Sequence, residues 1–147
     1  MTTLDDRVEL LRNATLFSGC TDDELARIAA LAAPRDAAPG ELLCTEGAPG
    51  EEFYVVVDGT AEASVGGEKV GDLGAGSFFG EMALIDGGDR TATVTATSAL
   101  QLLVLSRNDF NSMLATAMPT LAPKLLEVVG QRMREMQDQA GTSPFGY

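Results

Sequence analysis

Residues 78–97 read FFGEMALIDGGDRTATVTAT, a glycine-rich loop that ends in a single arginine and opens into a strand. Four threonines alternate with smaller apolar residues over the last seven positions, which is the two-residue period of a half-buried strand. Small inward side chains would leave room beside Arg90. Gly80 lets the backbone approach a ligand closely, and residues 81–85 are long enough for one helical turn with free amides. Because an arginine beside open amides suits a phosphate, this stretch predicts an anion pocket.

The charge of the chain narrows the class of ligand. Its formal net charge is -12, and between Arg35 and Arg107 its only basic residues are Lys69 and Arg90, against twelve acidic ones. Nucleic-acid binding needs a basic stripe that displaces counterions from the phosphate backbone. We therefore expect no nucleic-acid partner, whereas a small ligand with a single negative charge is compatible with this chain.

Length and composition indicate one globular domain. The chain has 147 residues, of which 45% are hydrophobic and 22% are charged, as in ordinary soluble proteins. The first seven residues lack the positive start and apolar stretch of a secretory signal, and the apolar runs are too short to span a bilayer. We expect a cytoplasmic protein without a membrane partner, with a single domain over residues 1–139 and a flexible tail over residues 140–147.

Histidine is absent from the sequence, which weighs against an enzyme. Its absence removes imidazole acid–base chemistry, imidazole-activated nucleophiles and most transition-metal sites. Cys20 and Cys44 lack a metal-binding or redox spacing, so we expect small buried hydrophobes, with a disulfide between them as the lesser alternative. The sequence therefore predicts no catalytic residue, no metal and no cofactor apart from a bound ligand.

The hydrophobic pattern predicts helices before a strand-rich block. A weakly amphipathic helix is expected over residues 4–11, and a second helix starts at Thr21, which can form a capping box with Glu24, and ends at Pro34. Glycine recurs every few residues from 39 to 106, which indicates short strands and tight turns. The best strand candidates are residues 41–44, 53–57, 60–65, 69–73, 91–97 and 100–105.

Helical spacing resumes after the strand-rich block. Residues 108–117 carry apolar side chains on one side, and a last helix is expected from about residue 120 to residue 139. Its apolar stripe would pack against the strands, cover a ligand, or pair with its copy in a homodimer. Together these patterns predict an α+β, mainly β fold: a jelly-roll barrel, or double-stranded β-helix, flanked by N-terminal helices and a C-terminal helix.

The sequence resembles the cyclic nucleotide-binding domain, the module of catabolite activator proteins, cAMP-dependent kinase regulatory subunits and cyclic nucleotide-gated channels. The resemblance covers roughly residues 10–139. EGAPG at 46–50 and FYVVVDG at 53–59 match the family's glycine-marked early strands. More specifically, FGEMAL at 79–84 followed by RTATV at 90–94 resembles the family's phosphate-binding cassette.

The resemblance implies a role for each cassette residue at the phosphate. Arg90 would pair with the charged exocyclic oxygens of a cyclic phosphate, and the Thr91 hydroxyl would add a donor. The other donors would be the backbone amides of Ala83, Thr91 and Ala92.

The resemblance also implies contacts to the sugar and the base. Glu81 would accept a hydrogen bond from the ribose 2′-hydroxyl, Gly80 would permit close approach, and Met82 would contact the sugar or base. The last helix would contact the base through Arg132, Met133, Met136 or Gln137. We expect cAMP as the ligand. Because Thr91 is compatible with both nucleotides, cGMP stays the alternative.

The leading hypothesis is a stand-alone cyclic nucleotide receptor, since no helix-turn-helix follows the last helix. Binding would reposition that helix and signal to a separate effector protein. Arg90 has a structural alternative, which is to brace the loop by pairing with Asp89 or Glu81. Two alternatives remain for the whole chain: a ligand-free β-roll interaction module with a closed pocket, and an enzyme acting on a cyclic nucleotide, which the missing histidines disfavour.

Overall fold

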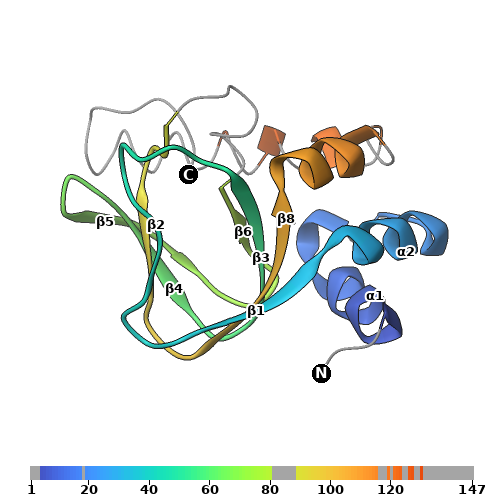
Figure 1. Ribbon diagram of the computed structural model, residues 1–147, viewed down its shortest axis with the longest axis horizontal. Helices are drawn as coiled ribbons and strands as arrows, with labels where there is room; N and C mark the ends of the chain where they lie inside the picture. Colours follow the sequence, from blue (N-terminus) through green and yellow to red (C-terminus); the bar gives the residue numbers. More distant parts are fainter. Residues whose placement is uncertain are drawn as a thin grey trace.

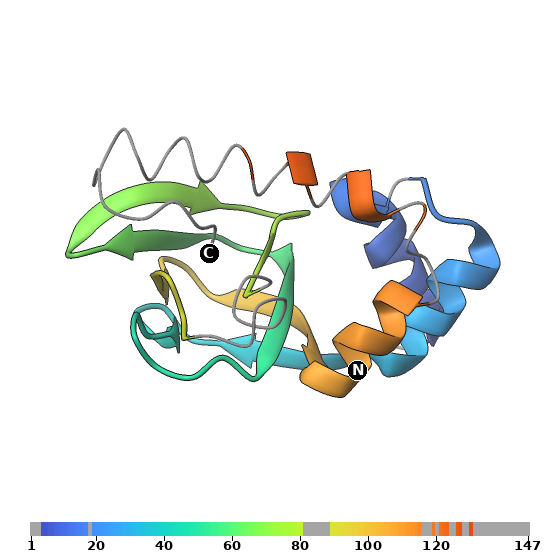
Figure 2. The same ribbon diagram turned by 90° about the horizontal axis from the view of Figure 1, so that it is seen from above.

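The computed structural model describes residues 4–17, 19–80, 89–115, 119, 121–123, 126–127 and 130. Two antiparallel sheets face each other, and helices cover the outer face of one of them (Figure 1, Figure 2). Among the described residues, no helix combines the length and hydrophobicity needed to traverse a bilayer. The architecture confirms the predicted mainly β jelly roll with flanking helices.

Each sheet has four strands. The strands are β1 (Ala33–Ala37), β2 (Leu42–Cys44), β3 (Glu52–Asp58), β4 (Ala61–Val65), β5 (Glu68–Leu73), β6 (Phe78–Phe79), β7 (Thr93–Ala96) and β8 (Leu100–Ser106). One sheet has the order β1-β8-β3-β6 and the other the order β2-β7-β4-β5. Because each sheet draws strands from both halves of the chain, the roll brings residues 47–54 close to Gly80 and Arg90.

Helix α2 begins where its capping signal predicts. The structure contains α1 (Leu4–Asn13), a 3-10 turn η1 (Thr15–Phe17) and α2 (Asp22–Leu31), and residues 107–115 are helical. The predicted capping box is confirmed: the Thr21 hydroxyl accepts from the Glu24 amide at 3.2 Å, and the Glu24 carboxylate accepts from the Thr21 amide at 2.9 Å.

The sequence prediction missed β1. We expected α2 to end at Pro34, but it ends at Leu31 and the chain passes directly into this strand. The segment APRDA contains a proline and shows no apolar alternation, so it gives no strand signal. Proline is tolerated here because β1 is an edge strand that pairs only with β8. The two-residue strand β6 was also missed, because it is too short to show a period.

Two apolar clusters share β3. Phe53 and Val55 point outward and pack with the helices, whereas Tyr54 and Val56 point into the roll between the two sheets. By contrast, β4 alternates buried and half-buried residues, so only one of its faces lies in a core. Cys44 is buried and Cys20 half-buried, and no disulfide joins these two described residues, so the disulfide alternative is wrong. The roll is therefore stabilised by packing on both faces of one sheet.

Candidate anion-binding site

Arg90 lies just before β7, where its backbone is fixed by the loop after β2. Its amide donates to the Ala48 carbonyl at 2.7 Å, and its carbonyl accepts from the Gly47 amide at 2.9 Å. The whole residue is only 6% exposed. These two hydrogen bonds fix the backbone of Arg90. Contacts within the roll, rather than solvent, therefore determine where its charged side chain lies.

The Arg90 guanidinium lies between two backbone carbonyls. Nη1 donates to the Gly80 carbonyl at 3.0 Å and Nη2 to the Glu52 carbonyl at 2.8 Å. The guanidinium carbon is 5.9 Å from the centroid of the Tyr54 ring, within cation–π range. Two of the five N–H groups of this side chain are thus used by neutral acceptors among the described residues.

Neutral carbonyls do not balance the charge of Arg90. Among the described residues, no carboxylate forms an ion pair with this guanidinium, and the predicted bracing partner Asp89 is exposed and does not pair with it. The other bracing partner, Glu81, lies outside the described residues. The described residues thus supply no counter-charge, and because a buried unpaired charge is costly, this arrangement favours an anion beside Arg90.

Gly80 makes the close approach to Arg90 possible. Its φ is +93°, and a Cβ at this position would lie 2.7 Å from the Glu52 carbonyl oxygen and 2.8 Å from Arg90 Nη1. Both distances are shorter than real Cβ contacts. The described atoms that approach this glycine belong to the protein itself, so its close approach to a ligand stays a prediction.

Gly80→Ala should lower the free energy of unfolding by about 1 to 3 kcal/mol, because alanine is strained at this φ and its Cβ would displace Arg90 and β3. Urea denaturation measures the loss. Gly40→Ala is the matched control, since Gly40 has a φ of +87° but no atom within 4 Å of the added Cβ. Equal losses in the two variants would contradict the role assigned to the contacts of Gly80.

A polar network lies next to the guanidinium of Arg90. The Tyr54 hydroxyl donates to the Glu52 carboxylate at 2.9 Å, and Arg35 lies 3.8 Å from the same carboxylate oxygen. Arg35 also pairs with Glu41 at 3.2 Å. Burial, reinforced by the hydrogen bond to Glu52, raises the pKa of Tyr54 to about 12, so its hydroxyl remains a donor at neutral pH.

The structure describes four of the seven cassette residues predicted from the sequence. Gly80 and Arg90 are in contact, Ala92 is buried inside the roll, and Thr91 is half-buried next to Arg90. The remaining predicted contacts lie outside the described residues: Glu81, Met82, Ala83, Arg132, Met133, Met136 and Gln137. Their predicted roles stay predictions.

Sequence analysis missed Glu52, Tyr54 and Arg35 as part of the site. Glu52 contributes a backbone carbonyl, which no residue type signals. Tyr54 stacks on Phe79 with ring centroids 4.7 Å apart, so it reads as an ordinary core aromatic. Arg35 belongs to the strand that the sequence prediction missed. Only the run FYVVV at 53–57 gave a signal, and it indicated a strand rather than a site.

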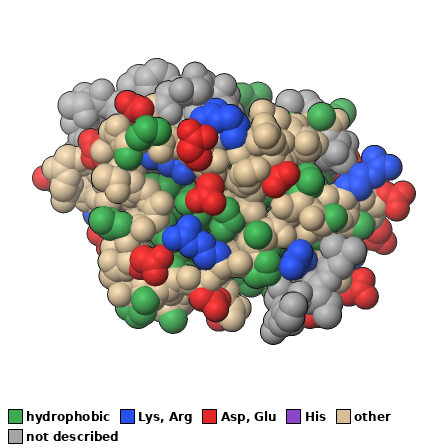
Figure 3. Space-filling model, viewed as in Figure 1, with side chains coloured by type: hydrophobic (Ala, Val, Ile, Leu, Met, Phe, Trp, Pro, Cys, Tyr) green, Lys and Arg blue, Asp and Glu red, His purple; other side chains and the backbone are tan. Residues whose placement is uncertain are grey.

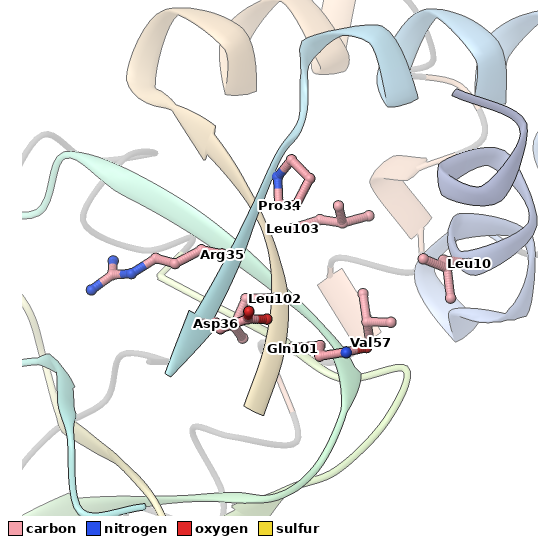
Figure 4. A pocket seen from close by; sticks show the side chains of 8 residues that line it. All are labelled: Leu10, Pro34, Arg35, Asp36, Val57, Gln101, Leu102 and Leu103. Atoms are coloured by element: carbon pink, nitrogen blue, oxygen red, sulfur yellow. The ribbon is translucent and has the colours of Figure 1, made fainter. Parts of the chain in front are cut away.

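A hollow of about 170 Å³ lies elsewhere, on the outer face of the helix-covered sheet. Figure 4 shows Leu10 of α1 and Val57 of β3 on its walls. Arg90 and Gly80 are not among the residues that line it, although Arg35 is, so this hollow is not the space beside the Arg90 guanidinium. Among the described residues, no three His, Cys, Asp or Glu side chains gather in a way that could hold a metal ion.

Basic side chains on the face in Figure 3 are interspersed with acidic ones.

Comparison with known proteins decides the family. The family model of the cyclic nucleotide-binding domain matches residues 34–117. The chain belongs to the cyclic nucleotide-binding domain family. This match contains all but the first residue of β1, the strands β2 to β8, Gly80 and Arg90, so the resemblance inferred from the sequence is confirmed.

Individual relatives of this cyclic nucleotide-binding domain are longer proteins. A cyclic nucleotide-gated potassium channel of Mesorhizobium japonicum is 37% identical over 78% of this chain and 31% of its own length. A cAMP-dependent protein kinase regulatory subunit of Hypocrea atroviridis is 36% identical over 71% of this chain and 22% of its own length. The structure of cAMP-bound PfPKA-R matches with a TM-score of 0.84 at 23% identity, over 92% of this chain and 46% of its own, which shows the shared fold.

Proposed function

We propose that this cyclic nucleotide-binding domain is a cAMP receptor that binds the cyclic phosphate at Arg90. The supporting observation is a cation that is 6% exposed and has only neutral acceptors among the described residues. A cyclic phosphate carries one negative charge, so one guanidinium neutralises it in the buried site. The cAMP-dependent relatives support cAMP over cGMP as the nucleotide.

The remaining cassette residues complete the proposed site. Thr91 and the amides of Ala83 and Ala92 would donate to the phosphate, and Glu81 would accept from the ribose 2′-hydroxyl. Met82 would contact the sugar or base. The C-terminal helix would contact the base through residues among Arg132, Met133, Met136 and Gln137.

We propose that the signal reaches the helices through residues 50–52. Arg107, the first residue of the helical segment 107–115, donates to the Gly50 carbonyl at 2.7 Å and lies 3.5 Å from the Glu51 carboxylate. The next residue, Glu52, holds Arg90 through its carbonyl. A ligand that shifts Arg90 would thus move the residues to which this helical segment is attached. A separate partner would sense the change through the C-terminal helix. We also expect the C-terminal helix to mediate homodimerisation.

Calorimetric titration of nucleotide-free protein tests this function. We expect saturable one-site binding of cAMP, tighter than that of cGMP. The acyclic 5′-AMP should bind weakly, because its dianionic phosphate leaves a buried charge uncompensated. Absence of heat with both cyclic nucleotides would contradict the receptor function and favour the alternative of a ligand-free interaction module. Hydrogen exchange on the same samples should change at residues 107–115 when cAMP is bound.

A further inference from the structure

A second arginine faces the interior of the roll close to Arg90. Arg35 lies opposite Leu102 in the β1–β8 pair, and Leu102 belongs to the cluster between the two sheets. Directly opposed residues of an antiparallel pair share one face of the sheet, so Arg35 is on the inner face. Arg35 is among the residues that line the outer hollow, but Figure 4 shows its side chain extending away from Leu10 and Val57, on the other side of β1 from Pro34.

Both arginines lie against the same aromatic ring. The guanidinium carbon of Arg35 is 6.0 Å from the Tyr54 ring centroid, and that of Arg90 is 5.9 Å from it. Their charges are balanced differently. Arg35 lies between two carboxylates, with Glu41 at 3.2 Å and Glu52 at 3.8 Å, whereas Arg90 is held by carbonyls. Among the described residues, the carboxylates of Glu41 and Glu52 therefore pair with Arg35 and not with Arg90.

Glu52 links the two arginines. Its carbonyl accepts from Arg90 Nη2 at 2.8 Å, while its carboxylate accepts from the Tyr54 hydroxyl at 2.9 Å and pairs with Arg35. The side chain can reach other positions by rotation about its χ angles. Since its own carbonyl already touches Arg90, a carboxylate without Tyr54 and Arg35 as partners could rotate toward that guanidinium. An arginine–carboxylate pair formed there would compete directly with an anionic ligand.

We propose that Arg35 is a positioning residue of the anion site: together with the Tyr54 hydroxyl, it holds the Glu52 carboxylate away from Arg90 and keeps the charge of Arg90 available to the cyclic phosphate. The ligand part of this inference rests on the proposed function. Arg35 itself need not touch the nucleotide, because it acts through Glu52. Its guanidinium is fixed for this task by Glu41, whose other carboxylate oxygen accepts from the Ala38 amide at 3.2 Å.

Three variants test the inference by calorimetric titration with cAMP, or with cGMP if wild-type protein binds cGMP more tightly. Arg35→Gln should raise the Kd about three- to tenfold, the size of a coupling between neighbouring charges. Glu52→Gln keeps the backbone carbonyl that binds Arg90 and removes a carboxylate that repels an anion, so it should lower the Kd. The double variant should bind like Glu52→Gln alone, because the competing carboxylate is gone. A double variant as weak as Arg35→Gln, or a wild-type Kd for Arg35→Gln, would overturn the inference.

Matched variants separate positioning from general effects of charge and folding. Arg35→Lys keeps the cation but loses the separate guanidinium contacts to Glu41 and Glu52, so it should raise the Kd less than Arg35→Gln does. Arg27→Gln removes one positive charge from an exposed position of α2 and should not change the Kd. An effect of Arg27→Gln as large as that of Arg35→Gln would show that net charge, not position, matters, and would also overturn the inference.

A ligand-free measurement distinguishes failure of this inference from failure of the proposed function. A double-mutant cycle between Glu52→Gln and Arg90→Gln, measured by urea unfolding, reports the coupling of these two side chains. We expect this coupling to be larger in the Arg35→Gln background than in the wild-type background. If wild-type protein bound neither nucleotide, the proposed function would fail, while an unchanged coupling would overturn the positioning role of Arg35.

Discussion

Replacement of Arg90 by glutamine should raise the Kd for cAMP tenfold to a hundredfold or more, and replacement by glutamate should abolish binding. A hydrogen bond to a charged group is worth about 1.5 to 3 kcal/mol, and each 1.4 kcal/mol is about a factor of ten in affinity. The glutamate variant adds repulsion of the phosphate. Titration of nucleotide-free variants with cAMP gives the Kd values.

The Arg90 variants need a control for folding, because the guanidinium also satisfies the carbonyls of Gly80 and Glu52. Circular dichroism and urea unfolding establish that each variant is folded at the temperature of the titration. Arg27→Gln, on the exposed face of α2, matches the change in charge and should bind cAMP like wild-type protein. A folded Arg90→Gln variant with wild-type affinity would contradict the assignment of the anion site.

Replacement of Phe53 by alanine should lower the free energy of unfolding by about 3 to 5 kcal/mol, the range for deleting a large aromatic side chain from a packed core. Phe53 is fully buried, and its ring centroid lies 5.6 Å from that of Phe78 and 4.9 Å from that of Phe110. The substitution therefore removes the ring contact between β3 and Phe110 of the helical segment 107–115. Urea denaturation followed by circular dichroism measures the change.

Leu42→Ala is the control for Phe53→Ala, because Leu42 is 56% exposed on β2. Its truncation should cost less than about 1 kcal/mol. A loss below about 1.5 kcal/mol for Phe53→Ala would show that the helical layer contributes little to the stability of the roll.

The sequence predicts most of the strands and the central arginine because these features are local. Alternation from Thr91 to Thr97 corresponds to β7, although the strand is shorter, covering Thr93–Ala96. Thr21 and Glu24 define the start of α2 through a motif of four residues. Arg90 stands out because it is one of two basic residues in a long acidic stretch.

The partners of Arg90 could not be predicted in the same way. Glu52 is 38 residues away in sequence and contributes a carbonyl, so its residue type carries no information about the contact. Arg35 reaches the site from a strand whose sequence contains a proline and lacks alternation. These groups are brought together by the register in which β1 and β3 each pair with β8. This pairing joins segments far apart in the chain, so a single sequence does not predict it.

The double burial of β3 has a practical consequence for anyone who wishes to redesign ligand preference. Its inward residues line the roll and its outward residues support the helices, so a bulkier or smaller substitute on one side will disturb whatever rests on the other. Substitutions in β3 that change ligand selectivity should therefore also lower the stability of the fold. Mutagenesis of β4, which has a core on only one side, offers a freer route to the interior of the roll.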